Sequence, residues 1–177
     1  AISDSKLNLS SGTVDVSASE GGVGVYVNGG TVTDSASTIT VGKNGVGLYA
    51  KDSSVTLTGS TINLFGDNAL GLYLDGTTNF SGTGNINISG QNVVLFNMNS
   101  SGAISNNFVV GSVTAGSTYT LGNITGGIFD YGGSSVLASN GTLVSGKQSA
   151  IYLNGSSTIT SALGSVNVAA VALDGQY

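Results

Sequence analysis

The sequence predicts an all-β fold, a right-handed parallel β-helix with three sides and three short strands in each coil. Three observations predict it: a recurring repeat, an alternation of apolar side chains within the repeat, and a composition unsuited to helices. Self-similarity at a fixed period of about 23–24 residues is typical of solenoids, in which each repeat is one small structural unit. We therefore expect about seven coils stacked along one axis.

An aromatic residue recurs in one short apolar context and marks the first strand of each repeat. The first three copies read VYVNG, LYAKD and LYLDG. The aromatic positions are Tyr26, Tyr49, Tyr73, Phe96, Phe129 and Tyr152. The steps between them are nearly equal, except for a longer one before Phe129. A seventh copy follows at 171–175, with Ala172 in place of the aromatic residue.

Two ladders of apolar residues repeat with the same period and mark the second and third strands. The second strand carries Leu9, Val32, Val55, Phe80, Val136 and Ile159. The third strand carries Val16, Ile39, Ile62, Ile86, Leu143 and Val166. Gly, Ser, Asn and Asp fill the corners between them, as turns require.

The alternation within the first strand predicts which side chains face inward. Val25 and Val27 share one parity, and Gly24 and Tyr26 share the other, which is the period of a strand. We expect the aliphatic parity to face the core and the tyrosines to stack outward beside outward-facing glycines. Crossovers between parallel strands are right-handed in nearly all proteins, which predicts the hand of the solenoid.

Composition excludes several classes of function. The chain has 29 Gly and no Pro, and few of the residues that build helix surfaces. A net charge of -5 with four Lys and no Arg indicates no surface for nucleic acid. Without His or Cys there is no Ser-His-Asp triad, disulfide or thiolate metal site. No apolar run is long enough to span a membrane as a helix, so we expect no such segment, and we expect no cofactor.

The repeat lengthens between Phe96 and Phe129. We expect 97–121 to be an irregular coil with an inserted loop, with strand pieces near Phe108 and Tyr119, inside a single solenoid spanning 1–177. Loops on a rigid scaffold often bind ligands, although an insertion without a function is the alternative. Ladder positions run close to both ends without a recognisable cap, so we expect a fragment of a longer repeat protein.

The six aromatic residues are the candidate binding site. Stacked outward beside bare glycine backbone, they form a shallow strip for sugar rings or for a partner protein. The alternative is that the rings only stabilise the ladder by stacking across strands.

Other candidate sites have simpler explanations. Asp52 and Asp75, with Lys51 nearby, have the character of an acid/base pair for glycan cleavage, but such a group in a turn is more often a solvated corner, and no catalytic residue is assigned. The Asn-Gly and Asp-Gly pairs are assigned to turns rather than to calcium, so no metal site is expected. Thr-x-Thr pairs resemble ice-binding surfaces but are interrupted by Asn and Ser.

The repeats GVGVYV … STITVG at 22–42 and GVGLYA … STINL at 45–64 resemble the passenger domains of large type Va autotransporter adhesins of Gram-negative bacteria. The resemblance covers essentially the whole chain and includes its low charge, its lack of Cys and its G-x-G-[VL]-Y motif. It implies an extracellular stalk on the bacterial cell surface, anchored in the outer membrane through a part of the parent protein outside this chain. It also implies attachment to a host or bacterial surface protein or glycan. A purely structural spacer and a carbohydrate-active β-helix enzyme remain the alternatives.

Overall fold

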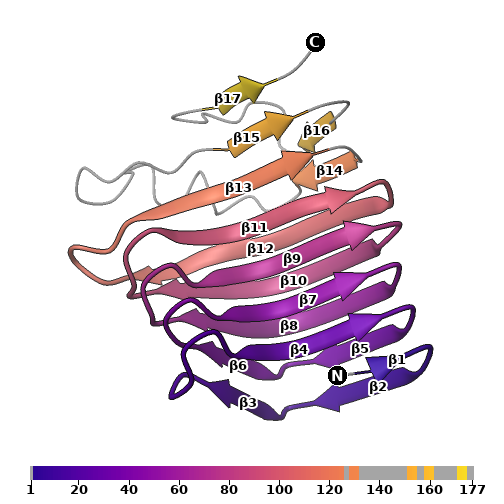
Figure 1. Cartoon of the computed structure of the whole chain (residues 1–177), viewed down its shortest axis with the longest axis horizontal. Coiled ribbons are helices and arrows are strands. Elements are labelled where there is room, and N and C mark those ends of the chain that lie inside the picture. The colour runs from indigo at the N-terminus through magenta and orange to yellow at the C-terminus, as the bar shows by residue number, and fades with distance from the viewer. Residues whose placement is uncertain (1, 126–127, 132–150, 155–157, 162–170, 175–177) are drawn as a thin grey trace.

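The protein is an all-β solenoid of parallel strands (Figure 1). The computed structural model describes residues 2–125, 128–131, 151–154, 158–161 and 171–174. Within these residues the strands form two sheets, one with eight strands and one with nine. From β1 to β11 the chain steps through the eight-stranded sheet in about four turns.

Each coil contributes one strand to the eight-stranded sheet. In spatial order these strands are β1 (Ile2–Ser3), β4 (Val23–Asn28), β7 (Val46–Lys51), β9 (Leu70–Gly76), β11 (Val93–Ser100), β13 (Tyr119–Thr125), β15 (Ile151–Asn154) and β17 (Val171–Asp174). The nine-stranded sheet contains β2 (Lys6–Ser10), β3 (Thr13–Val16), β5 (Thr31–Ser35), β6 (Thr38–Val41), β8 (Ser54–Leu64), β10 (Asn79–Ile88), β12 (Ala103–Val113), β14 (Ile128–Tyr131) and β16 (Thr158–Ser161).

The second and third extended segments of each repeat belong to the same sheet. In the first two coils they are separate strands, β2 with β3 and β5 with β6. From the third coil onward they join into the single long strands β8, β10 and β12. Where β10 pairs with β8, the register shifts between Gly82 and Gly84, so a bulge remains at the former corner.

The pairing confirms the predicted ladders and corrects their first members. Val32, Val55 and Phe80 lie opposite one another, and Ile39, Ile62 and Ile86 do the same. Leu7, not Leu9, pairs with Val32, and Val14, not Val16, pairs with Ile39. Both errors are shifts by two positions, which leave the inward parity unchanged. The predicted members Val136, Leu143 and Val166 lie outside the described residues.

Inward-facing side chains of both sheets form one core along the axis. Leu48 and Leu72 of the eight-stranded sheet and Ile62 of the nine-stranded sheet are fully buried at 0% exposure. Each such side chain contributes roughly 1.5–3 kcal/mol. Stacked coils make the core continuous, because each coil covers the apolar side chains of the coil beside it.

The glycines of the eight-stranded sheet face inward, which corrects the prediction of bare outer backbone. A Cβ on Gly24 would lie 2.8 Å from Cγ2 of Ile39, and a Cβ on Gly47 would lie 2.7 Å from the carbonyl oxygen of Gly71. Two successive residues therefore face the core at this point of the strand, and strict alternation fails there. In β11 the same position holds Leu95, which is fully buried.

The corner that follows each of the first four strands of the eight-stranded sheet alternates between aspartate and glycine. Asp4, Gly29, Asp52 and Gly76 occupy it in successive coils, and all four have positive φ. Oδ1 of Asp52 accepts hydrogen bonds from the backbone N–H of Thr77 at 2.9 Å and from its hydroxyl at 3.2 Å. A Cβ on Gly76 would lie 2.1 Å from that same oxygen. Each of these two aspartates thus lies against a glycine of the next coil, where an added Cβ would displace the carboxylate.

The segment 97–121, expected to carry an inserted loop, contains the end of β11, the whole of β12 and the start of β13. The predicted strand pieces near Phe108 and Tyr119 fall in β12 and β13, and both side chains are buried. Asn97 pairs with Tyr73 on one side and with Asn123 on the other, so this coil is only slightly longer than the coil before it. One additional residue falls at the register shift beside Gly111 in β12, and the other falls in the turn near Gly116, where φ is positive.

Candidate functional site on the outer face of the eight-stranded sheet

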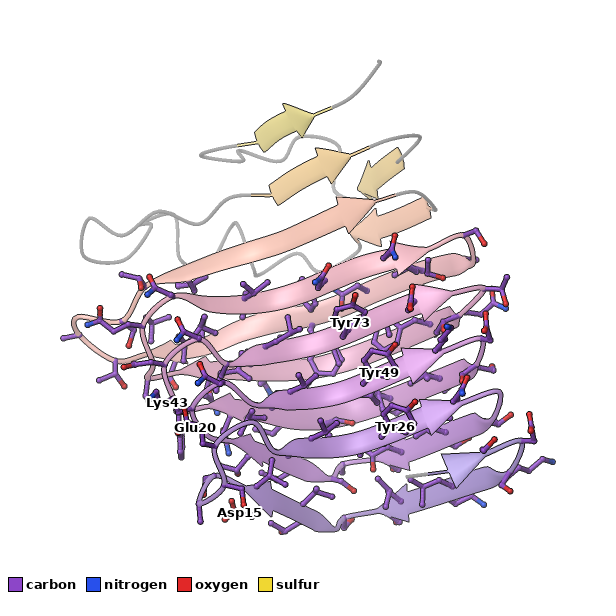
Figure 2. All side chains as sticks on the ribbon, in the orientation of Figure 1. Asp15, Glu20, Tyr26, Lys43, Tyr49 and Tyr73 are labelled. Carbon is purple, nitrogen blue, oxygen red and sulfur yellow. The ribbon has the colours of Figure 1, made fainter. Side chains whose placement is uncertain are left out.

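Three of the six predicted aromatic residues stand one above another on this face. Tyr26, Tyr49 and Tyr73 are direct backbone partners on β4, β7 and β9 (Figure 2). The ring centroids of Tyr26 and Tyr49 lie 5.1 Å apart with an interplanar angle of 4°. Those of Tyr49 and Tyr73 lie 4.9 Å apart at 25°. Tyr26 is 38% exposed, so the predicted outward stack is confirmed for these three residues.

Phe96 and Phe129 do not belong to this column, which corrects the prediction. Phe96 pairs with Leu72 and is buried in the core at 1% exposure, while Asn97 pairs with Tyr73. Phe129 lies on β14 in the other sheet, where it pairs with Ile104 and Ile159.

The error at Phe96 has a simple cause in the register. The step from Tyr73 to its backbone partner Asn97 is one position longer than the step from Tyr73 to Phe96. The accompanying step in the other sheet, from Ile86 on β10 to its backbone partner Val110 on β12, has the same longer length. The apolar ladder of the other sheet is therefore the signal that could have revealed the true register.

The column continues beyond the three tyrosines in backbone register. Asn123 pairs with Asn97, Tyr152 pairs with Asn123, and Ala172 pairs with Tyr152. The predicted positions of Tyr152 and of the seventh copy at Ala172 therefore agree with the pairing. The aromatic column is interrupted by two asparagines, and among the side chains that the structure describes the stacked rings are those on β4, β7 and β9.

The stacking decides which part of each tyrosine ring faces solvent. Rings about 5 Å apart and nearly parallel cover one another's faces, so Tyr49 has a ring on both sides. Its outward contact surface is therefore the ring edge and the hydroxyl. This geometry favours packing against apolar side chains over stacking of a sugar ring on the aromatic face.

Two further columns complete this face, and neither contains an aromatic residue. The apolar column consists of backbone partners on β4, β7, β9 and β11: Val23, Val46, Leu70 and Val94. Val23 is 40% exposed and the other three are half-buried. The polar column lies on the other side of the tyrosines and consists of Asn28, Lys51, Asp75 and Asn99. Sequence reasoning missed the apolar column, because it assigned the whole aliphatic parity to the core.

The tyrosine column and the polar column are joined at Asp75. Its Oδ2 accepts a hydrogen bond from the hydroxyl of Tyr49 at 3.4 Å, and its Oδ1 accepts one from Nδ2 of Asn99 at 3.0 Å. Partial burial raises the pKa of Tyr49 above its ordinary value of 10.0, and the negative charge of Asp75 raises the pKa further. The hydroxyl thus stays protonated and donates to the carboxylate.

The aspartates considered for catalysis lie in different environments. Asp52 holds the corner at Thr77, as described above, and Asp75 lies on the outer face. Asp34 faces the core of the nine-stranded sheet at 1% exposure, and its Oδ2 accepts a hydrogen bond from the hydroxyl of Ser60. Asp52 and Asp75 thus lie on adjacent coils, where the N–H of Asp52 donates to the carbonyl oxygen of Asp75 at 3.4 Å, whereas Asp34 lies in the core.

The outer face of the nine-stranded sheet is polar on β5, β6, β8 and β10. One column contains Thr33, Thr56 and Ser81, all exposed. In another, Nδ2 of Asn63 donates to the hydroxyl of Thr40 at 3.3 Å, and Nδ2 of Asn87 donates to Oδ1 of Asn63 at 2.9 Å. Asn and Ser interrupt the threonines in both columns, as the sequence indicates.

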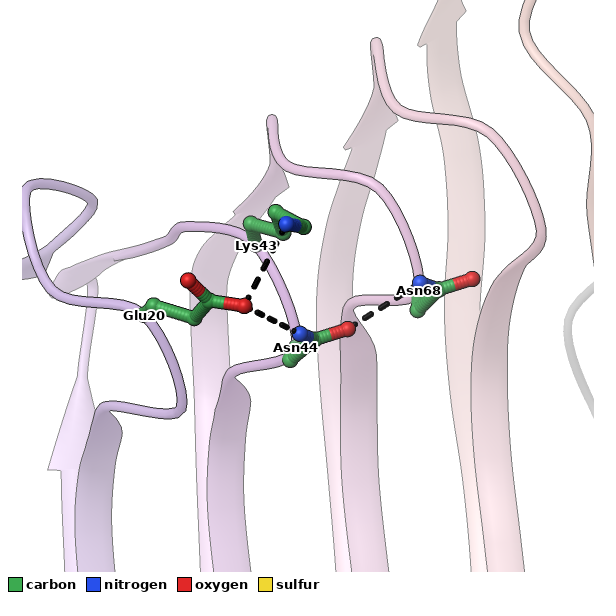
Figure 3. A network of polar contacts seen from close by, with 4 residues as sticks. All are labelled: Glu20, Lys43, Asn44 and Asn68. Carbon is green, nitrogen blue, oxygen red and sulfur yellow. Dashed lines mark hydrogen bonds and ion pairs between the residues drawn. The ribbon is translucent and has the colours of Figure 1, made fainter.

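A further polar ladder lies at the corners before β7 and β9 (Figure 3). Nδ2 of Asn44 donates to Oε1 of Glu20 at 2.7 Å, and Nδ2 of Asn68 donates to Oδ1 of Asn44 at 3.0 Å. Lys43 forms an ion pair with Glu20 at 3.3 Å, in which both side chains are more than half exposed. Asn44 and Asn68 have positive φ, so these corner asparagines serve the turn as well as the ladder.

Neither a metal site nor a membrane span emerges from the described residues. No group of three or more acidic side chains is arranged there to hold a metal ion. No helix in that part of the chain has the length and hydropathy needed to cross a bilayer. No family model, curated protein or solved structure matches the chain. The fold and the face together define a β-solenoid with one apolar, aromatic side.

Proposed function

We propose that the chain is a surface-displayed adhesin or stalk segment of a bacterial autotransporter, which mediates or supports attachment to host cells or other bacteria. The observation that carries the proposal is the outer face of the eight-stranded sheet, where valine, leucine and tyrosine replace the polar residues of the other sheet. Apolar patches on the surface of soluble proteins commonly mark interaction sites. The repeat resemblance supports a position for that face outside the cell, on a part of the parent anchored in the outer membrane.

The finer architecture is part of the same proposal. We take the solenoid to be right-handed, since parallel crossovers have that hand, with about seven coils. We also take its cross-section to be three-sided in the first coils, which the separation of β2 from β3 and of β5 from β6 supports. The register that runs from β1 to β17 supports the coil number.

Binding of the purified chain to cultured host cells, to bacteria and to a glycan array tests the function. We expect binding that falls about tenfold in Tyr73→Ser, which removes one ring from the exposed column. The matched control is Thr56→Ala on the outer face of the nine-stranded sheet, which should bind like the wild type. A folded chain that binds none of these surfaces, while its parent does, contradicts the adhesin proposal and favours a structural spacer.

The spacer is the second candidate, and the stacking of the tyrosines favours it. Rings that cover one another's faces stabilise the strand ladder without any ligand. The carbohydrate-active enzyme is the third candidate and receives a separate test. Asp52→Asn abolishes any cleavage of acidic or neutral glycans if Asp52 is catalytic, and a wild-type chain without cleavage activity excludes this interpretation.

A further inference from the structure

The outer face of the eight-stranded sheet is self-complementary, because a two-fold rotation brings matching residues of two copies together. Consider a two-fold axis parallel to the strands that passes between β7 and β9. The operation turns the second copy over, so that each column meets the same column of the other copy. It also exchanges coils: β7 faces β9 of the second copy, and β4 faces β11. Interfaces of this isologous kind are the commonest in homodimers.

This operation matches apolar with apolar and charge with opposite charge. Val46 faces Leu70 of the second copy, Tyr49 faces Tyr73, and Lys51 faces Asp75. The same three contacts occur again with the copies exchanged. In the outer coils Val23 faces Val94 and Asn28 faces Asn99, which are chemically equivalent pairs. We propose that this face binds a second copy of the chain, with the two solenoids antiparallel.

The charges on the face support this occupant. Lys51 and Asp75 are direct backbone partners on β7 and β9, yet within the described residues the ion pair that forms is Lys43 with Glu20. Asp75 directs its two oxygens at Tyr49 and Asn99. Two antiparallel copies bring each lysine ammonium over the carboxylate of the other copy, which adds two intermolecular ion pairs.

The alternative two-fold axis, parallel to the solenoid, does not match. It places the apolar column of one copy against the polar column of the other at the same height. Leu70 then faces Asp75 and Val46 faces Lys51, so charged groups are buried against aliphatic side chains without a partner, which is costly. The arrangement of the three columns therefore selects the antiparallel pairing.

The expected dimer is weak, because the face is small. Four strands about 4.8 Å apart, each about 20 Å long, cover roughly 400 Å² per copy. Stable interfaces bury about 800 Å² per partner. Aligned packing of two sheets about 10 Å apart accommodates the tyrosine edges between them. We therefore expect self-association at high micromolar concentrations or above. This self-association does not depend on display of the chain on a cell, so its test is separate from the test of the proposed function.

Charge reversal tests the proposal by sedimentation velocity on the full chain. Asp75→Lys places lysine against lysine across the interface, and Lys51→Asp places aspartate against aspartate, so each variant alone should dimerise roughly tenfold more weakly than the wild type. A mixture of the two variants should form heterodimers at least as tight as the wild-type dimer, since every facing pair is then of opposite charge. Lys43→Asp, away from the face, is the matched control and should dimerise like the wild type. Circular dichroism verifies that each variant is folded.

Disulfide trapping tests the orientation, which the absence of natural cysteine makes simple. Tyr26 faces Asn97 of the second copy in the antiparallel pairing, so Tyr26→Cys mixed with Asn97→Cys should cross-link several-fold faster than either variant alone. Preferential Tyr26→Cys homodimers overturn the orientation. A wild-type chain that stays monomeric at millimolar concentration, or a mixture of charge variants that fails to associate, overturns the proposal. In that case another protein or a glycan becomes the occupant of the face.

Discussion

The two outer faces of this solenoid are made from the same kind of backbone and differ in chemistry. Parallel strands with the same coil spacing form both sheets, and both bury aliphatic side chains inward. Outward, the nine-stranded sheet carries threonine, serine and asparagine, as Thr33, Thr56 and Ser81 illustrate. The eight-stranded sheet carries an apolar column and a tyrosine column.

The difference shows that folding alone explains the outer residues of the nine-stranded sheet but not those of the eight-stranded sheet. Polar side chains at outward strand positions are hydrated by solvent, so folding alone accounts for them. Apolar side chains there gain nothing from the core of their own coil, so another contact explains them better. For Tyr26, Tyr49 and Tyr73 part of that contact is the neighbouring ring. The apolar column is stacked as well, yet three of its side chains stay only half-buried and Val23 is 40% exposed.

The largest effect should be the difference in stability between substitutions on the inner and on the outer face of the nine-stranded sheet. Ile62→Asn buries an amide among aliphatic side chains and should lower the free energy of unfolding by about 4 kcal/mol. Thr61→Asn, the adjacent outward position, should change it by less than about 0.5 kcal/mol. Urea denaturation of both variants measures the difference. Equal midpoints would show that the inward parity is assigned wrongly.

A smaller effect should come from the inward glycines of the eight-stranded sheet. Gly47→Ala places a Cβ 2.7 Å from the backbone oxygen of Gly71, and we expect a loss of about 2 kcal/mol as the coils shift apart. Gly12→Ala is the control, because its Cβ would meet only the hydroxyl of Ser37 at 3.6 Å. Thermal unfolding compares the two. A Gly47→Ala variant as stable as Gly12→Ala would show that the inward glycines are not required.

The smallest effect should be a change in stability at high pH, caused by the titration of Tyr49 on the outer face of the eight-stranded sheet. The pKa of Tyr49 lies above the value of the unfolded chain, so its protonated form contributes stability in full below about pH 10. This contribution is lost as the pH rises through the raised pKa of the folded state. The difference in phenolate absorbance between the wild type and Tyr49→Phe isolates this titration. Asp75→Asn should shift it back toward pH 10.0, and a titration at the ordinary value in the wild type would contradict the coupling.

The sequence predicts how the coils stack better than it predicts which residues lie on the outer face. The ladder through Val32, Val55 and Phe80 follows directly from the repeat, because parallel pairing keeps like positions opposite one another. Predicting the tyrosine column required the strand register to be known to the exact residue. The coil after Tyr73 is one position longer than the aromatic spacing, and this places Phe96 in the core. A local aromatic motif carries no information about such a shift.

The outer face was harder to predict for a second physical reason. Simple alternation assigns every other residue inward, but at Gly24 and its equivalents two successive residues face the core. That local change of parity places Val23 outward and at 40% exposure. The number of sheets also depended on context, because the second and third segments join into β8 only from the third coil onward.

The alternating corner has a consequence for how such a chain grows. Asp4, Gly29, Asp52 and Gly76 show that neighbouring coils are not equivalent, since an aspartate carboxylate occupies the space that a Cβ would need in the next coil. Gene duplication or loss of one coil would set aspartate over aspartate or leave two glycines without a cap. From β1 to β9 this corner therefore repeats every second coil, twice the length that the repeat suggests at first reading, and in β11 Ser100 lies opposite Gly76.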